Sequence, residues 1–186
     1  MPPRWRTLCK GRRCGFYSSR EHCGFLSCWK DAVAAGGKDA WKKHALEFLR
    51  ASNYAGIAFG HAGCAAVHAM AYPLGGVHHI PHGQANQLMF ADVMRKYQEK
   101  KPIGKLNQLE ELLGAELDVE PVFSLENLYK LMDEVLKKDP LHEHGVTADE
   151  LPVFAKNVIE TQQRLLGNNY VELSEDDLLD IYRKAF

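Results

Sequence analysis

The sequence predicts an all-α fold, and three of its features support that prediction. Apolar residues recur at helical spacing through most of the chain after residue 28. No pair of strands and no hairpin turn is recognisable. Hydrophobic residues make up 46% and charged residues 25% of the 186 positions, which is typical of a globular protein with a sizeable core. We therefore expect a helical bundle, built as one domain or as one domain and a small piece.

Charge and cysteine content divide the chain near residue 28. The segment 1–28 carries six Lys or Arg and one acid, whereas 29–186 carries 17 Lys or Arg and 23 acids. We expect 1–28 to be a leader that is poorly ordered or does not belong to the original protein, and 29–186 to be the helical domain. The net charge of −1 gives no reason to expect nucleic-acid binding. Four of the five cysteines lie in the leader: Cys9, Cys14, Cys23 and Cys28.

The leader does not look like a secretory signal. It lacks the apolar stretch of such a signal, and no run in the chain approaches the roughly 20 apolar residues that span a membrane. We therefore expect a cytoplasmic protein with reduced thiols and no membrane partner. The leader cysteines form two Cys-x4-Cys pairs, which are wider than most zinc knuckles. A poorly ordered segment is favoured over a zinc-binding module.

The helical domain begins with two short predicted helices within 29–51, on either side of Gly36-Gly37. Next, residues 52–74 contain no Asp, Glu, Lys or Arg and are rich in Ala and Gly. This pattern predicts a helix over 52–73 that is buried on all sides. Pro73 and the glycines that follow it are expected to end this helix.

Five further helices are predicted in the rest of the chain. Pro81 opens the first of them, because proline is favoured in a first helical turn. Ser174 caps the last one and is followed by three acids. The expected ranges are 82–98, 104–114, 124–138, 147–165 and 174–184.

Histidines on both sides of the predicted helix end form the clearest candidate site. His68 and Tyr72 are four residues apart and project from one helix face, and His82 enters the next helix after a Gly-Gly loop. Two imidazoles from facing helices can meet inside a bundle, and neutral imidazole suits iron or zinc. His78 and His79 are expected in the loop. A catalytic metal normally takes three or more protein ligands, so the remaining ligands must come from elsewhere.

The stretch NYAGIAFGHAGCAAVHAMAYPLGG, followed by PHGQAN, resembles the signature of the iron-containing (group III) alcohol dehydrogenases. The two metal-ligand histidines of that family segment match His68 and His82. Tyr72 stands where many members have a second histidine. This variant and the C-terminal segment IETQQRLLGNNYVELSEDDLLDIYRKAF are similar to the 4-hydroxybutyrate dehydrogenase branch. The resemblance covers about residues 29–186.

The resemblance implies the helical C-terminal domain of an NAD-dependent alcohol dehydrogenase. In the intact enzyme the expected reaction interconverts 4-hydroxybutyrate and succinate semialdehyde. The expected metal is Fe²⁺ or Zn²⁺, held by the two ligand histidines. Tyr72 would face the reacting centre, with a buried structural tyrosine as the alternative. Phe59, His61 and His78 would line the cofactor and substrate cleft, with a plain core role still open for Phe59.

The resemblance also shows what this chain lacks. Family members are longer, and they bind the NAD pyrophosphate with a Gly-Gly-Gly-Ser turn that does not occur here. Their Asp-x-x-x-His ligand pair precedes the matching region, where this chain has the leader and no Asp before Asp31. We expect that a frame-shifted or misjoined coding segment precedes a genuine C-terminal half. The upstream coding sequence would test this expectation.

Three functions remain open at this point. The first is the metal-binding half of an alcohol dehydrogenase that acts on a small-molecule alcohol or aldehyde. The second is a catalytically inactive truncated fragment, or a subunit completed by a separate N-terminal half or by self-association as a homo-oligomer. The third is a zinc-binding interaction module made by the leader cysteines.

Overall fold

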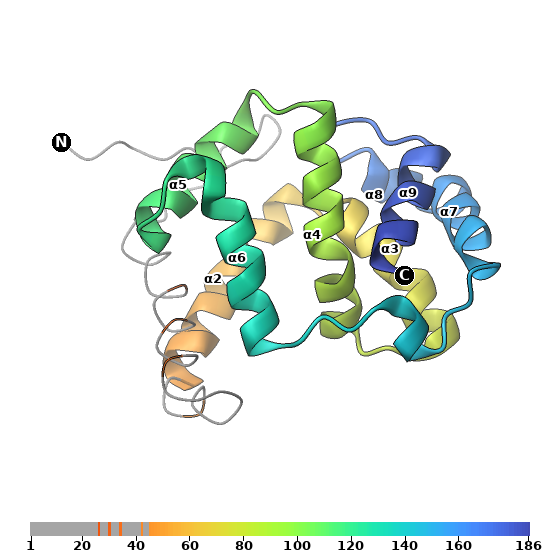
Figure 1. Ribbon diagram of the computed structural model, residues 1–186, viewed down its shortest axis with the longest axis horizontal. Coiled ribbons are helices and arrows are strands. Elements are labelled where there is room, and N and C mark those ends of the chain that lie inside the picture. The colour runs from red at the N-terminus through yellow and green to blue at the C-terminus, as the bar shows by residue number, and fades with distance from the viewer. Residues whose placement is uncertain (1–25, 27–29, 31–33, 35–41, 43–44) are drawn as a thin grey trace. The chain divides into compact units, whose positions relative to one another are not determined.

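The computed structural model describes residues 26, 30, 34, 42 and 45–186 (Figure 1). All regular secondary structure within these residues is helical, which confirms the all-α prediction. The four leader cysteines lie outside the described residues, so the expected order and zinc binding of 1–28 stay predictions. Among the described helices, none combines the length and the apolar character that a membrane crossing requires.

The chain divides into two compact units. The first unit comprises Met1–Ala62 and Gly104–Lys137, and the second comprises Gly63–Ile103 and Lys138–Phe186. The predicted ligand histidines, His68 and His82, both belong to the second unit.

The first unit contains three described helices, which are α2 (Ala45–Ala62), α5 (Lys105–Leu117) and α6 (Pro121–Val135). Helices α5 and α6 pack against each other as a hairpin. A Cβ atom at Gly114 would lie 2.9 Å from the carbonyl oxygen of Val119, so glycine permits the close turn between them.

The second unit is a bundle in which α3 packs on α4, α4 on α9, and α7 on α9, with α3 also touching α7 and α8. The side chains of Met70, Leu88, Met89, Ile181 and Tyr182 are almost completely buried in its core. Its elements are α3 (Ala66–His78), α4 (His82–Lys100), the 3-10 helix η2 (Leu141–His144), α7 (Glu150–Thr161), α8 (Gln163–Leu166) and α9 (Glu175–Ala185).

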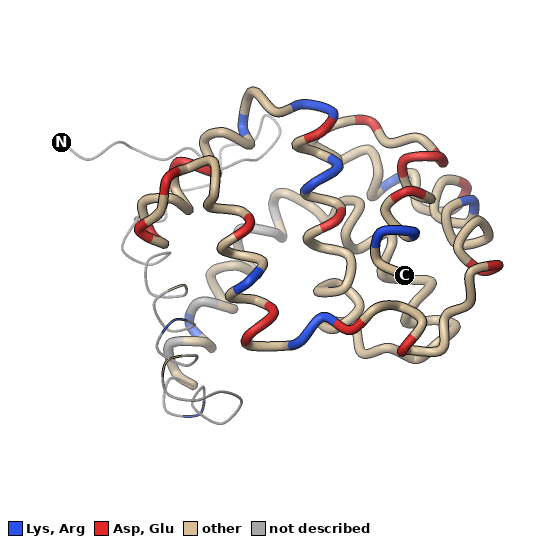
Figure 2. Tube along the Cα trace, in the orientation of Figure 1, with Lys and Arg blue, Asp and Glu red and all other residues tan. Residues whose placement is uncertain are grey.

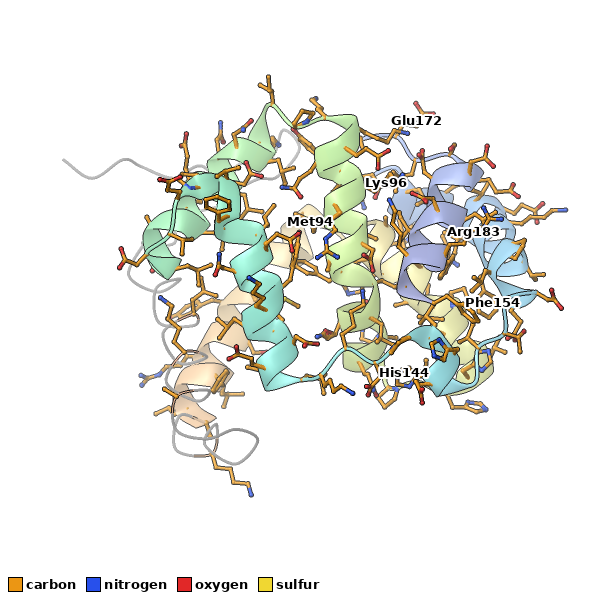
Figure 3. All side chains as sticks on the ribbon, in the orientation of Figure 1. Met94, Lys96, His144, Phe154, Glu172 and Arg183 are labelled. Carbon is orange, nitrogen blue, oxygen red and sulfur yellow. The ribbon has the colours of Figure 1, made fainter. Side chains whose placement is uncertain are left out.

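Ion pairs join α9 to α4. The nearly buried Lys96 of α4 (Figure 3) lies 2.5 Å from an Asp180 carboxylate oxygen, and Lys100 pairs with Asp177. Burial lowers the pKa of Lys96, but hydrogen bonds to Asp180 and Glu99 outweigh this effect, so its pKa is raised. Figure 2 shows the acidic first turn and basic last turn of α9, an arrangement that complements the helix dipole.

The predicted single helix over 52–73 is wrong in its middle and at its C-terminal end. The structure divides the run at Gly63, whose φ of 79° lies in the left-handed region that ends a helix. The following helix, α3, then continues through Pro73 to His78. Proline removes one backbone hydrogen bond, and the tight packing of Met70 and Leu74, both 0% exposed, holds the helix together across it.

The prediction that this run is buried on all sides is also wrong. Within the run, Ile57 is 40% exposed and Tyr72 is 43% exposed. Helix α3 ends where His79 adopts a φ of 55° and donates its backbone N–H to the carbonyl of Leu74.

The helices predicted after residue 81 exist, most of them with shifted boundaries, whereas most of the region of the two short helices predicted within 29–51 lies outside the described residues. Helix α6 begins earlier than expected because Pro121 occupies its first turn. The helix predicted over 147–165 is two helices, α7 and α8, separated at Gln162. Helix α9 begins as predicted, with the Ser174 hydroxyl accepting a hydrogen bond from the backbone N–H of Asp177.

Candidate metal centre

The structure brings His68 and His82 together. His68 lies in the first turn of α3, and His82 is the first residue of α4. Their ring centroids are 5.3 Å apart, with the ring planes inclined at 52°. These helices are neighbours in the bundle, so the two imidazoles meet although 13 residues separate them in the sequence.

The electrostatic environment favours neutral imidazole at this position. Burial, and then the proximity of His82, lower the pKa of His68. The Asn86 side-chain nitrogen, one turn further along α4, donates a 3.0 Å hydrogen bond to Nε2 of His82. An amide nitrogen can only donate, so this contact uses the same lone pair of Nε2 with which a histidine would bind a metal.

The two histidines fit half of a metal centre. Neutral imidazole nitrogens suit Fe²⁺ and Zn²⁺, and such centres commonly use four or more ligands. Within the part of the chain that the structure describes, no three or more His, Cys, Asp or Glu residues are grouped so that they could hold a metal ion. Further ligands would have to be supplied to this pair from outside those residues.

Tyr72 lies one turn after His68 on α3. Its side chain is 43% exposed, which contradicts the alternative that it is a buried structural tyrosine. A phenol in this place is accessible to a molecule that approaches the histidine pair.

His78 is the last residue of α3 and not a loop residue as predicted. Its Nε2 lies 3.0 Å from a carboxylate oxygen of Glu150, and its ring stands edge-on to that of Phe154. Phe154 belongs to α7 and is labelled in Figure 3. The predicted role of His78 in a cofactor or substrate cleft stays a prediction. The contacts observed join the end of α3 to the start of α7.

Sequence reasoning missed Glu150. A hydrogen bond from the backbone N–H of Thr147 is the main reason that the pKa of Glu150 is lowered; burial opposes the shift, while the Thr147 hydroxyl and His78 add to it. The Thr147-x-x-Glu150 spacing resembles a capping box and could have revealed the helix start. Nothing local in the sequence indicates the partner, His78.

The remaining predicted cleft residues, Phe59 and His61, belong to α2 in the first unit. Their side chains lie outside what the structure describes, so their predicted roles stay predictions.

Two polar contacts hold α3 in place on either side of the predicted ligand His68. At the start of the helix, the backbone N–H of Ala66 donates a 2.8 Å hydrogen bond to the side-chain oxygen of Asn169. In the middle, the hydroxyl of Tyr182 donates a 2.7 Å bond to the carbonyl of Met70. Burial raises the pKa of Tyr182, so this hydroxyl keeps its proton.

Comparisons with known proteins agree with the resemblance seen in the sequence. Residues 30–186 match the family described as the Fe-containing alcohol dehydrogenase family, C-terminal. The chain is 45% identical over 140 residues to the 4-hydroxybutyrate dehydrogenase of Clostridium kluyveri, covering 75% of this chain and 38% of that protein. It is 33% identical over 158 residues to long-chain-alcohol dehydrogenase 1 of Geobacillus thermodenitrificans, covering 83% of this chain and 39% of that protein.

Solved structures share the fold. An alcohol dehydrogenase from an archaeal halo-thermophilic organism of a Red Sea brine pool superposes with a TM-score of 0.70 at 24% identity, over 90% of this chain and 43% of that one. The iron-containing alcohol dehydrogenase of Corynebacterium glutamicum gives a TM-score of 0.67 at 18% identity, with the same coverage. This chain therefore spans less than half the length of the relatives it matches.

Proposed function

This chain belongs to the iron-containing alcohol dehydrogenase family and corresponds to the C-terminal domain of its members. We propose that it forms the helical half of a metal centre in an NAD-linked alcohol dehydrogenase. The observation that carries the proposal is the convergence of His68 and His82, with ring centroids 5.3 Å apart. The lowered pKa of His68 supports it, because a neutral imidazole is ready to bind a cation.

The proposed substrate pair is 4-hydroxybutyrate and succinate semialdehyde. Support comes from the 45% identity to a protein named 4-hydroxybutyrate dehydrogenase. The metal, Fe²⁺ or Zn²⁺, would be held by His68 and His82 together with ligands supplied from beyond the described residues.

A bound metal of this kind supplies Lewis acidity toward an alcohol or carbonyl oxygen. The work of this chain is to hold the metal and to line one side of the reacting centre. Tyr72, exposed and one turn from His68, is placed to hydrogen-bond the substrate or to transfer a proton through its hydroxyl. The NAD pyrophosphate site must be supplied by another segment or chain, because this sequence has no Gly-Gly-Gly-Ser turn.

A second candidate function is that of an inactive or partner-completed helical protein. This second candidate is favoured because the described residues bring together two histidines, His68 and His82, and no third potential metal ligand. Both candidates predict an inactive isolated chain, so turnover tests that shared premise and metal binding distinguishes the two candidates. We expect the purified 186-residue chain to produce no detectable NADH from NAD and 4-hydroxybutyrate in the presence of Fe²⁺. Robust turnover by the chain alone would contradict the proposal that it holds only half of the centre.

Metal titration tests the proposed centre itself. We expect the full chain to bind Co²⁺ in a manner that His68→Ala and His82→Ala each weaken by at least about tenfold, since each removes one ligand. The matched control is His142→Ala, which removes an exposed histidine of η2 that contacts Phe186. Equal Co²⁺ binding by all three variants and the parent chain would refute the centre.

A further inference from the structure

The start of α3 has no polar group of its own to cap it. Its N-cap residue is Ala65, which makes no side-chain hydrogen bond, and the adjoining Gly63 and Cys64 carry no side-chain oxygen. Ala66 is 0% exposed, so its backbone N–H has no access to water. A buried donor in this position requires a partner, and none is available nearby in the sequence.

Asn169, located 103 residues further along the chain, supplies that partner. Its side-chain oxygen accepts 2.8 Å and 2.9 Å hydrogen bonds, from the backbone N–H of Ala66 and from the hydroxyl of Tyr97. Ala66 belongs to α3 and Tyr97 to α4, so one oxygen atom joins the two helices that carry the histidine pair. Burial raises the pKa of Tyr97, which keeps its hydroxyl a donor.

The residues on either side of Asn169 make further contacts near the start of α3 and the end of α4. Asn168 donates a 2.9 Å hydrogen bond to the carbonyl of Cys64, in the loop that leads into α3. Tyr170 donates to the carbonyl of Ile103, and its ring lies edge-on to Tyr97 with centroids 6.1 Å apart. The Asn168–Tyr170 segment therefore contacts both the start of α3 and the far end of α4.

His68 lies only two residues after Ala66, within the first helical turn. The position of that turn relative to α4 decides how far His68 stands from His82. We propose that Asn169 is a positioning residue of the metal centre: its side-chain oxygen fixes the first turn of α3 against α4, and so fixes His68 relative to His82. This inference rests on the proposed function and deepens it.

The side-chain nitrogen of Asn169 is buried and has no hydrogen-bond partner in the structure. This detail provides a variant that keeps the acceptor: Asn169→Asp retains an accepting oxygen, replaces the atom without a partner, and adds a negative charge, which is favourable at the N-terminus of α3. Asn169→Ala removes the acceptor. Ser174→Ala is the matched control, because it also removes a cap from a helix start, but from α9, which carries no ligand histidine.

The test uses the full 186-residue chain with Cu²⁺, which binds imidazole more tightly than the other first-row divalent metals. The quantity measured is the affinity of the histidine-dependent Cu²⁺ site, which is the binding that the parent chain shows and the His68→Ala/His82→Ala double variant lacks. We expect Asn169→Ala to lower the Cu²⁺ affinity of this site about tenfold, within the range for residues that orient ligands. Electron paramagnetic resonance should show the coupling of one histidine nitrogen instead of two. Asn169→Asp should restore binding to within about threefold of the parent chain, and Ser174→Ala should retain it within about twofold.

Two results would overturn the inference. One is parental Cu²⁺ affinity and two-nitrogen coupling in folded Asn169→Ala; the other is equal weakening by Asn169→Asp and Asn169→Ala. If Asn169→Ala does not fold, Tyr97→Phe decides the question, because it removes one of the two donors to the Asn169 oxygen. We expect about threefold weaker binding from it, and unchanged binding would refute the role.

Failure of the proposed function gives a different result. In that case the double variant binds Cu²⁺ as the parent chain does, and there is no histidine-dependent signal to weaken. Amide hydrogen exchange then tests whether Asn169 fixes the first turn of α3, independently of metal binding. We expect the Ala66 amide to exchange about tenfold faster in Asn169→Ala and at the parental rate in Asn169→Asp. An unchanged rate in Asn169→Ala would overturn the inference.

Discussion

Helices α9 and α3 begin in opposite ways. The cap of α9 is local, since the Ser174 hydroxyl accepts from the backbone of Asp177, whose side chain accepts in return from the backbone of Ser174. The cap of α3 is remote, since Ala65 has no capping side chain and Asn169 caps the helix from 103 residues away. The start of a locally capped helix is determined by residues within its own first turn. The start of α3 depends instead on a contact that forms only when the bundle is folded.

This difference matters because α3 carries His68, one of the two proposed metal ligands, and α9 carries neither of them. A remote cap joins the helix start to its neighbours, so the position of His68 depends on the folding of the whole unit. The local cap of α9 lies on a helix without either histidine, so we expect its loss to affect the stability of that helix more than the histidine pair.

The largest effect is expected from a change directly before α3. Gly63 has a φ of 79°, and a Cβ atom there would lie 2.7 Å from the side-chain nitrogen of Asn168. We expect Gly63→Val to lower the free energy of unfolding by about 2–3 kcal/mol, because it combines backbone strain with a clash. Urea denaturation measures this change.

Gly76→Ala is the control at the other end of α3. A Cβ atom at Gly76 would meet nothing within 4 Å, so alanine should be neutral or stabilise the helix by up to about 1 kcal/mol. Equal destabilisation by both substitutions would contradict the special role given to the start of α3.

A smaller effect is expected at the locally capped helix. Ser174→Ala should lower the free energy of unfolding by about 1 kcal/mol, because it leaves the Asp177 backbone N–H without its acceptor. Ser174→Asp, which can still cap, should retain most of the parental stability. Thermal denaturation followed by circular dichroism would detect both results, and a stable Ser174→Ala variant would show that the local cap contributes little.

The two helix starts should also differ in their response to acid. Hydrogen bonds and the charges of lysines lower the pKa of Asp177 and of Asp180, although burial opposes the shift at both. Each carboxylate binds fewer protons in the folded state, so its contribution is complete above the unfolded pKa of about 3.9 and is lost as the pH falls through the lower folded value. Asn169 does not titrate.

Urea midpoints measured from pH 7 down to pH 3 would test this difference. We expect the midpoint to fall below about pH 4 in the parent chain and to fall less in Asp177→Asn, which has no carboxylate at that position. A parallel fall in the two proteins would show that other carboxylates control acid stability.

The smallest effect is expected at the start of α4. Asn86 donates a hydrogen bond to the His82 Nε2 lone pair that a metal would need. We expect Asn86→Ala to raise the affinity for Cu²⁺ by up to about fivefold, the equivalent of one hydrogen bond of about 1 kcal/mol. Isothermal titration calorimetry measures the affinity. A weaker affinity would instead show that Asn86 orients the imidazole ring.

Local patterns in the sequence predicted much of the fold. The helical class, the start of α9 at Ser174 and the existence of α4, α5 and α6 follow from apolar periodicity and capping residues. The motif around His68 and His82 identified the pair that the structure brings together. In each case the information lies within a few residues of the feature it predicts.

The sequence alone determined the family, the helical class and the identity of the histidine pair, because these depend on residue type and short-range spacing. The tertiary structure decided the rest. It broke the apolar run at Gly63, carried α3 past Pro73 to His78, and joined His78 to Glu150. It also placed the Asn169 oxygen at the start of α3, where a buried N–H had no local acceptor. Long-range packing satisfies a buried backbone donor wherever an acceptor becomes available, and no local pattern records that choice.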